Sequence, residues 1–152
     1  MKNHTQDGFT IIELVVVIAL LGLLAAVALP KFVSLTTEAR AATLEGVRGS
    51  FQSSILLIHA RWIATGGSGA TVTLEDGSTV NVNAAGWPTI DSANAAQDTA
   101  QELYDLIIQE SLPTPEWSFS ETPGAGAGTG TYTLNGTGGG AFTYDASTGD
   151  VS

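Results

Sequence analysis

The residues of this chain whose types and spacing could do chemistry lie near its amino terminus. Gly8 stands directly before Phe9, and Glu13 follows inside a run of apolar residues. A small residue that precedes an apolar segment is a candidate cleavage junction, and cutting there would leave the segment on the mature protein. Cleavage after Gly8 would create an ammonium group on Phe9. The Glu13 carboxylate needs such a partner, because a lone charge in an apolar medium is costly.

The apolar run extends from Phe9 to Pro30 and has no polar side chain between Leu14 and Leu29. As a helix it would span roughly 31 Å at about 1.5 Å per residue, close to the roughly 30 Å hydrocarbon core of a bilayer. The run is therefore predicted to cross a membrane once. Pro30 removes one backbone hydrogen bond, so a bend is expected there, and Gly22 is a second weak point in the helix.

The order of these features resembles the amino-terminal signal of the type IV prepilins. The matching residues are Gly8, Phe9, Thr10 and Glu13, preceded by a polar leader at residues 1–8. The resemblance implies that a prepilin peptidase cuts after Gly8 and methylates the Phe9 amine, and that Glu13 of one copy pairs with Phe9 of the next. It also implies an α+β pilin fold, in which a long kinked amino-terminal helix packs on a small antiparallel sheet.

The function implied by this resemblance is that of a structural pilus subunit. Residues 1–8 would be removed, residues 9–30 would form the transmembrane and assembly helix, and residues 31–152 would form the head. The subunit would be held in the inner membrane of a Gram-negative bacterium before assembly. The pilus assembly platform would then polymerise it with other copies of itself into an extracellular filament for surface attachment. The alternatives are a pseudopilin of a type II secretion system and a membrane-anchored binding domain.

Later stretches resemble the mannose-sensitive haemagglutinin branch of the type IVa pilins. These are PKF at 30–32, ARAATLEGVRG at 39–49 and GWP at 86–88. Many type IV pilins carry a disulfide in the carboxyl-terminal part of the head, whereas this chain has no cysteine. It therefore has no disulfide, thiolate nucleophile or cysteine metal site.

The charge distribution bears on the partners of the head. The formal net charge is -10, all five Lys and Arg residues fall in the first 61 positions, and eleven of the fifteen acids follow Arg61. An acidic surface repels phosphate backbones, so the head is not expected to bind nucleic acid.

The helical pattern resumes after Pro30 and predicts an amphipathic helix that ends at Gly66 and Gly67. Its apolar stripe consists of Leu44, Val47, Phe51, Ile55, Ile58 and Trp62. Alternating apolar residues on either side of Asp76-Gly77 then predict a hairpin with a two-residue turn.

A second helix and a sheet are predicted in the rest of the head. The helix would be capped by Asp91 or Ser92, carry Ala96, Ala100, Leu103 and Ile107 on one face, and run to about Glu110. Strands are expected around 117–119, 131–134 and 142–144, forming an antiparallel sheet on which the amphipathic helix could pack.

Catalysis, cofactors and metals are not expected. His59 would be the only histidine left after leader removal, and its expected role is packing or surface. The chain has no Cys and no Lys after Lys31, so neither nucleophile is offered there, and no paired acid stands out from the general acidity of the head. Asp145, Ser147 and Asp150 could offer oxygen ligands to calcium, but the twelve-residue loop pattern of calcium-binding helix pairs is absent.

Overall fold

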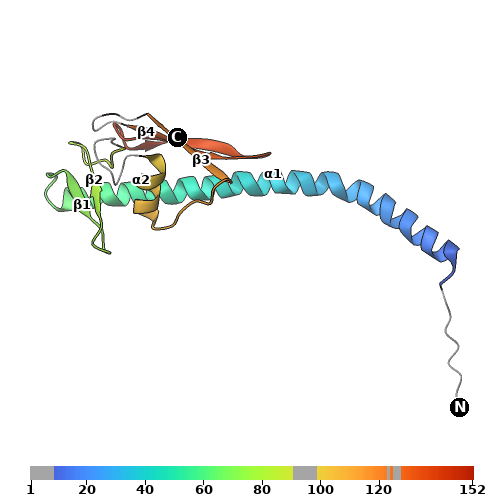
Figure 1. The fold of residues 1–152 in the computed structure, drawn as a ribbon. Coiled ribbons are helices and arrows are strands. Elements are labelled where there is room, and N and C mark those ends of the chain that lie inside the picture. Colours follow the sequence, from blue (N-terminus) through green and yellow to red (C-terminus); the bar gives the residue numbers. More distant parts are fainter. Residues whose placement is uncertain (1–8, 91–98, 123, 125–127) are drawn as a thin grey trace, which may run out of the picture. The chain divides into compact units, whose positions relative to one another are not determined.

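The computed structural model describes residues 9–90, 99–122, 124 and 128–152 (Figure 1). The leader therefore lies outside the described residues. The chain divides into two compact units, of which the first ends at Thr37 and the second is Glu38–Ser152. Helix α1 (Ile11–Ala64) contributes to both units. A long amino-terminal helix with small antiparallel sheets confirms the expected α+β class.

The remaining elements all belong to the second unit. They are β1 (Thr71–Thr73), β2 (Thr79–Asn81), α2 (Ala100–Ile108), β3 (Trp117–Thr122), β4 (Thr129–Leu134), β5 (Gly140–Asp145) and β6 (Asp150–Val151). Strands β1 and β2 form one sheet, and the other four strands form a second sheet in the order β3-β4-β5-β6, with every pair antiparallel. The three strands predicted in the tail are confirmed, whereas β6, only two residues long, was not predicted.

The part of α1 in the second unit carries the predicted apolar stripe. Phe51, Ile55 and Ile58 are buried at 0–3% relative exposure. The helix ends at Ala64, and the following Gly66 adopts a positive φ of 110°, as expected just beyond a helix end. The spacing of apolar residues was therefore a sufficient guide to this helix and to its buried face.

The hairpin between β1 and β2 is confirmed, but its predicted two-residue turn is wrong. The Leu74 amide donates to the Ser78 carbonyl at 2.8 Å, so three residues lie in the loop. Of these, Gly77 takes a positive φ of 88°. Asp76 does not adopt the left-handed conformation that a primed turn requires, and its carboxylate accepts bonds from the Ser78 amide and hydroxyl at 2.9 and 2.6 Å. These bonds lower the pKa of Asp76, the hydroxyl bond contributing most.

Helix α2 begins with a reciprocal cap between Thr99 and Glu102. The Thr99 hydroxyl accepts from the Glu102 amide at 3.1 Å, and the Glu102 carboxylate accepts from the Thr99 amide at 3.1 Å. This pair satisfies two amide donors at the helix start. The cap of α2 is therefore Thr99 rather than Asp91 or Ser92 as predicted. Those two residues and Ala96 lie outside the described part of the chain.

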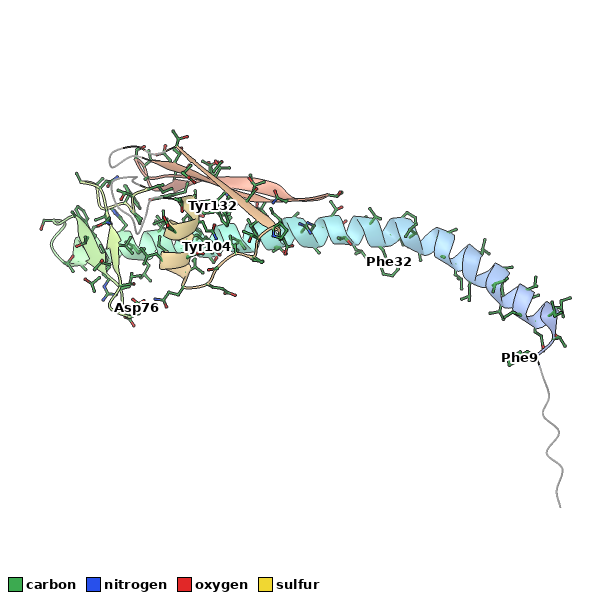
Figure 2. The ribbon with its side chains drawn as sticks, viewed as in Figure 1. Phe9, Phe32, Asp76, Tyr104 and Tyr132 are labelled. Carbon is green, nitrogen blue, oxygen red and sulfur yellow. The ribbon has the colours of Figure 1, made fainter. Side chains whose placement is uncertain are left out.

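The core of the second unit is built around the ring of Phe51. This side chain is fully buried, and its centroid lies 5.1–5.9 Å from the rings of Tyr104, Tyr132, Phe142 and Tyr144. Figure 2 shows Tyr104 and Tyr132 beside the carboxyl-terminal part of α1. One residue of α1 thus joins the helix to α2, β4 and β5, and the predicted packing of helix on sheet is confirmed.

Backbone pairing holds the carboxyl-terminal region of the second unit. Thr143 and Ser152 exchange two amide-to-carbonyl hydrogen bonds at 2.8 and 2.9 Å. Val151 is buried, and the Asn83 side-chain amide donates to the Ala146 carbonyl at 2.6 Å. The end of the chain is therefore fixed by β-pairing, by the buried Val151 side chain and by the hydrogen bond from Asn83 in the loop after β2.

Candidate assembly site on the amino-terminal helix

Thr10 and Glu13 form a reciprocal cap at the start of α1. The Glu13 Oε2 atom accepts from the Thr10 amide at 2.9 Å and from the Thr10 hydroxyl at 2.7 Å, while the Glu13 amide donates to the Thr10 hydroxyl at 3.4 Å. The same arrangement begins α2. Both hydrogen bonds that the Glu13 carboxylate accepts from Thr10 end on Oε2. The Oε1 atom is therefore open to a partner from outside the described chain. Thr10 therefore fixes the rotamer of the carboxylate.

Phe9, just before α1, and Glu13, in its first turn, line the same hollow. With Ile12, Val16 and Val17 they line an open hollow of about 420 Å³. Phe9 is 94% exposed and lies at the start of the described chain (Figure 2). An amino group created on Phe9 would be one residue from Thr10, whose amide already contacts Glu13. The turn thus brings the two predicted assembly residues together.

Among the described residues of the first unit, 9–37, the apolar part of α1 has no packing partner. Every large hydrophobic side chain from Phe9 to Leu35 is at least 50% exposed. This helix is long and apolar enough to cross a membrane by length and composition. In water such a surface is unfavourable at roughly 25 cal/mol per Å². The segment is therefore suited to a lipid environment or to contact with other apolar helices.

Gly8 lies outside the described residues, so the cleavage junction stays a prediction. The chain is helical through both Gly22 and Pro30, and the bend expected at Pro30 also stays a prediction. A Cβ atom added at Gly22 would meet no atom within 4 Å. Close packing within the described chain therefore does not explain this glycine.

His59 has a packing role in the second unit. Its ring stacks on Trp87 with centroids 3.7 Å apart and an interplanar angle of 11°. Its Nδ1 lies 3.2 Å from the Gly86 carbonyl, so this nitrogen carries the proton and donates. On the far side of Trp87 a side chain at Gly149 would overlap the indole. The stack ties α1 to the loop after β2 and to the β5–β6 turn.

The residues considered for calcium are occupied by local hydrogen bonds. Asp145 accepts from the Ser147 hydroxyl at 2.6 Å and from the Ser147 amide at 2.8 Å, which together lower the pKa of Asp145. The Asp150 amide donates to the Thr148 hydroxyl at 3.3 Å, and Asp150 lies opposite Asp145 in the β5–β6 pair. In the described part of the chain, no three His, Cys, Asp or Glu side chains gather as metal ligands would.

Arg40 is a structural residue that the sequence patterns did not single out. Its guanidinium lies 3.6 Å from the Glu116 carboxylate and donates to the Asn135 carbonyl, joining α1 to the end of the β3–β4 pair at which Trp117 pairs with Leu134. These partners are far along the chain, so no local spacing pointed to them. Thr10 was also missed as a positioning residue, although Thr-x-x-Glu before an apolar run is a recognisable capping signal.

Comparison with known proteins agrees with the geometry of the first helix turn. Residues 3–29 match the family profile described as the prokaryotic N-terminal methylation motif. The chain is 40% identical over 91 residues to the type IV narrow pilus major component PilA5 of Thermus thermophilus, a match that covers 51% of this chain and 78% of that protein. The chain belongs to the type IV pilin family. The prediction of family and fold class is thereby confirmed, and because pilins are structural proteins, so is the prediction that this pilin is not an enzyme.

Other relatives match a shorter part of the pilin. It is 43% identical over 63 residues to the type IV major pilin protein PilE1 of Neisseria gonorrhoeae and, over the same length, to a fimbrial protein of Neisseria meningitidis. These matches cover 40% of this chain but only 38% and 37% of those proteins. No solved structure matches significantly. The narrower resemblance to the mannose-sensitive haemagglutinin branch stays a prediction.

Proposed function

We propose that this pilin is a filament subunit that polymerises through α1 into an extracellular pilus used for surface attachment. The observation that carries the proposal is an apolar stretch, residues 9–35, whose large side chains are all exposed and whose single acid, Glu13, is held in place by Thr10. The helix suits a membrane before assembly and other copies of the helix afterwards. In this proposal the inner membrane of a Gram-negative cell holds the subunit until the assembly platform extracts it.

Processing comes first in this proposal. A prepilin peptidase cuts after Gly8, removes residues 1–8 and methylates the new amino group of Phe9. Cleavage creates a positive charge near the depth of the Glu13 carboxylate. The residues 9–30 then act as the transmembrane and assembly helix, and residues 31–152 as the head.

The pairing step uses the geometry of the first turn. In the membrane Glu13 is protonated or hydrogen-bonded, because an isolated carboxylate is costly in a low-dielectric medium. The contact from Thr10 supplies part of this compensation before assembly. In the growing filament the Phe9 ammonium of a neighbouring copy approaches the open Oε1 atom. Helix packing provides most of the cohesion, and the charge pair selects the register.

The experiment is mass spectrometry of protein sheared from cells. The proposal expects abundant sheared filaments whose subunits begin with methylated Phe9, and a Gly8→Val variant that stays uncut because a branched side chain replaces a hydrogen atom. Gly8→Ala is the matched control, since it adds only one methyl group. Periplasmic protein without surface filaments would indicate a secretion pseudopilin, and monomeric membrane protein would indicate an anchored binding domain.

A further inference from the structure

A groove in the second unit lies apart from the amino-terminal assembly turn. It has a volume of about 530 Å³ and is enclosed by α1, the β1–β2 loop and the end of α2. Leu57, Leu74 and Ile107 supply apolar walls, and Leu57 is 71% exposed. Arg61 and Glu75 supply its charged lining residues. The groove is therefore a partly apolar surface with one cation, Arg61, and one acid, Glu75, in its lining.

Arg61 is unusual among the cations of this unit. The unit carries three arginines and thirteen acids. Arg40 pairs with Glu116 at 3.6 Å and Arg48 pairs with Glu45 at 2.7 Å, whereas Arg61 makes no ion pair with any described residue. An exposed cation that finds no acid in so acidic a unit is available to an acid from elsewhere.

Glu38 is the complementary group at the other end of the same helical segment. It is exposed and forms no ion pair within the described part of the chain. The exposed residues Ala41 and Ala42 lie within one turn of it, so a neighbour can approach this face closely. This face of α1 therefore presents Glu38 beside two small side chains.

The spacing of Glu38 and Arg61 suits a contact between parallel copies. Arg61 follows Glu38 by 23 residues on α1. That separation corresponds to about 35 Å along the helix and about 140° around it. The two charges thus lie on nearly opposite faces, so one copy can present Glu38 while the next presents Arg61. A contact between two different surfaces of the same chain leaves both outer surfaces free and generates an open filament.

We infer that the groove at Arg61 receives the Glu38 turn of α1 from a second copy, with an ion pair between Glu38 and Arg61 of different subunits. Leu57 and Ile107 then cover the small side chains beside Glu38. The inference rests on the proposed function, since it assumes a filament of parallel copies. It adds a head-to-head contact, distinct from the Phe9–Glu13 pair, that fixes the stagger between two subunits.

Charge reversal in the full-length protein tests this contact. Glu38→Arg or Arg61→Glu alone should lower the yield of sheared filament by about tenfold, because coupling energies of close interfacial charge pairs exceed 1.4 kcal/mol. The double reversal should restore the yield to within about threefold of wild type. Arg48→Glu is the control, because the acid partner of Arg48 is Glu45 of the same chain. Any loss of filament yield that Arg48→Glu causes should not be restored by adding Glu38→Arg.

Crosslinking gives an independent readout, because the natural chain has no cysteine. Filaments of a Glu38→Cys, Arg61→Cys double variant, treated with a bifunctional maleimide, should yield a ladder of linked subunits, and each single variant should not. Wild-type cells without filaments would overturn the proposed function itself. Wild-type filaments, combined with a double reversal that fails to recover and a double cysteine variant that gives no ladder, would overturn only this contact.

Discussion

Replacing Phe51 by Ala tests how the second unit is held together. The Phe51 side chain is fully buried and contacts four aromatic rings that come from three elements. Phe-to-Ala changes in protein cores lower the free energy of unfolding by about 3–5 kcal/mol. Because Phe51 contacts four rings, we expect a loss of about 4 kcal/mol for Phe51→Ala. Since small domains are stable by only about 5–15 kcal/mol, the variant should be close to unfolding.

Urea unfolding of a fragment that begins at Phe32 measures the effect. With an m-value of about 2 kcal/mol per molar, the loss corresponds to a midpoint lower by about 2 M. Leu57→Ala is the matched control, because Leu57 lies on the same helix but is 71% exposed, and it should change stability by less than about 0.5 kcal/mol. A Phe51→Ala cost below about 1 kcal/mol, or equal costs for the two variants, would refute this description of the core.

Three further expectations concern the head fragment. Tyr144→Phe removes a buried hydroxyl that donates to the Pro88 carbonyl at 2.7 Å, and should cost about 1–3 kcal/mol in denaturant unfolding. Ser147→Ala should raise the pKa of Asp145 in a carboxyl NMR titration. The stability from this lowered pKa is present at neutral pH and lost as pH falls through it, so the variant should be destabilised at neutral pH but not in strong acid. Finally, the fragment should show no measurable affinity for duplex DNA at physiological salt, and tight salt-sensitive binding would contradict the charge argument.

The parts of the fold that were predictable are those set by local periodicity. The burial of Phe51 follows from apolar residues three or four apart, and the β1–β2 hairpin from alternation. The turn at Asp76 was mispredicted, because Asp-Gly suits both a two-residue and a three-residue loop and the Asp76 bonds to Ser78 favour the longer one. The cap of α2 was misplaced, although Thr99 and Glu102 already carried the capping pattern.

The candidate site was predictable in its residues but not in its contacts. Glu13 stands out because it is the single acid in an apolar run, and Phe9 because it follows the small residue Gly8. The bond from Thr10 to Glu13 needed the geometry of the helix start. The contacts of Arg40 join residues far apart in the chain, and only the folded arrangement of α1 and the sheet brings them together.

The filament yield of a Glu13→Val variant is the most direct test of assembly through the first helix turn. The change makes the membrane segment more apolar, so insertion and cleavage after Gly8 should persist, as mass spectrometry of the membrane fraction would show. Sheared filament should fall by at least about tenfold, because the partner of the Phe9 ammonium is gone. Leu14→Val, an apolar change at the neighbouring position, should leave the yield near wild type. Loss of cleavage together with filaments would place Glu13 in recognition by the peptidase, and wild-type amounts of filament from Glu13→Val would contradict the pairing mechanism.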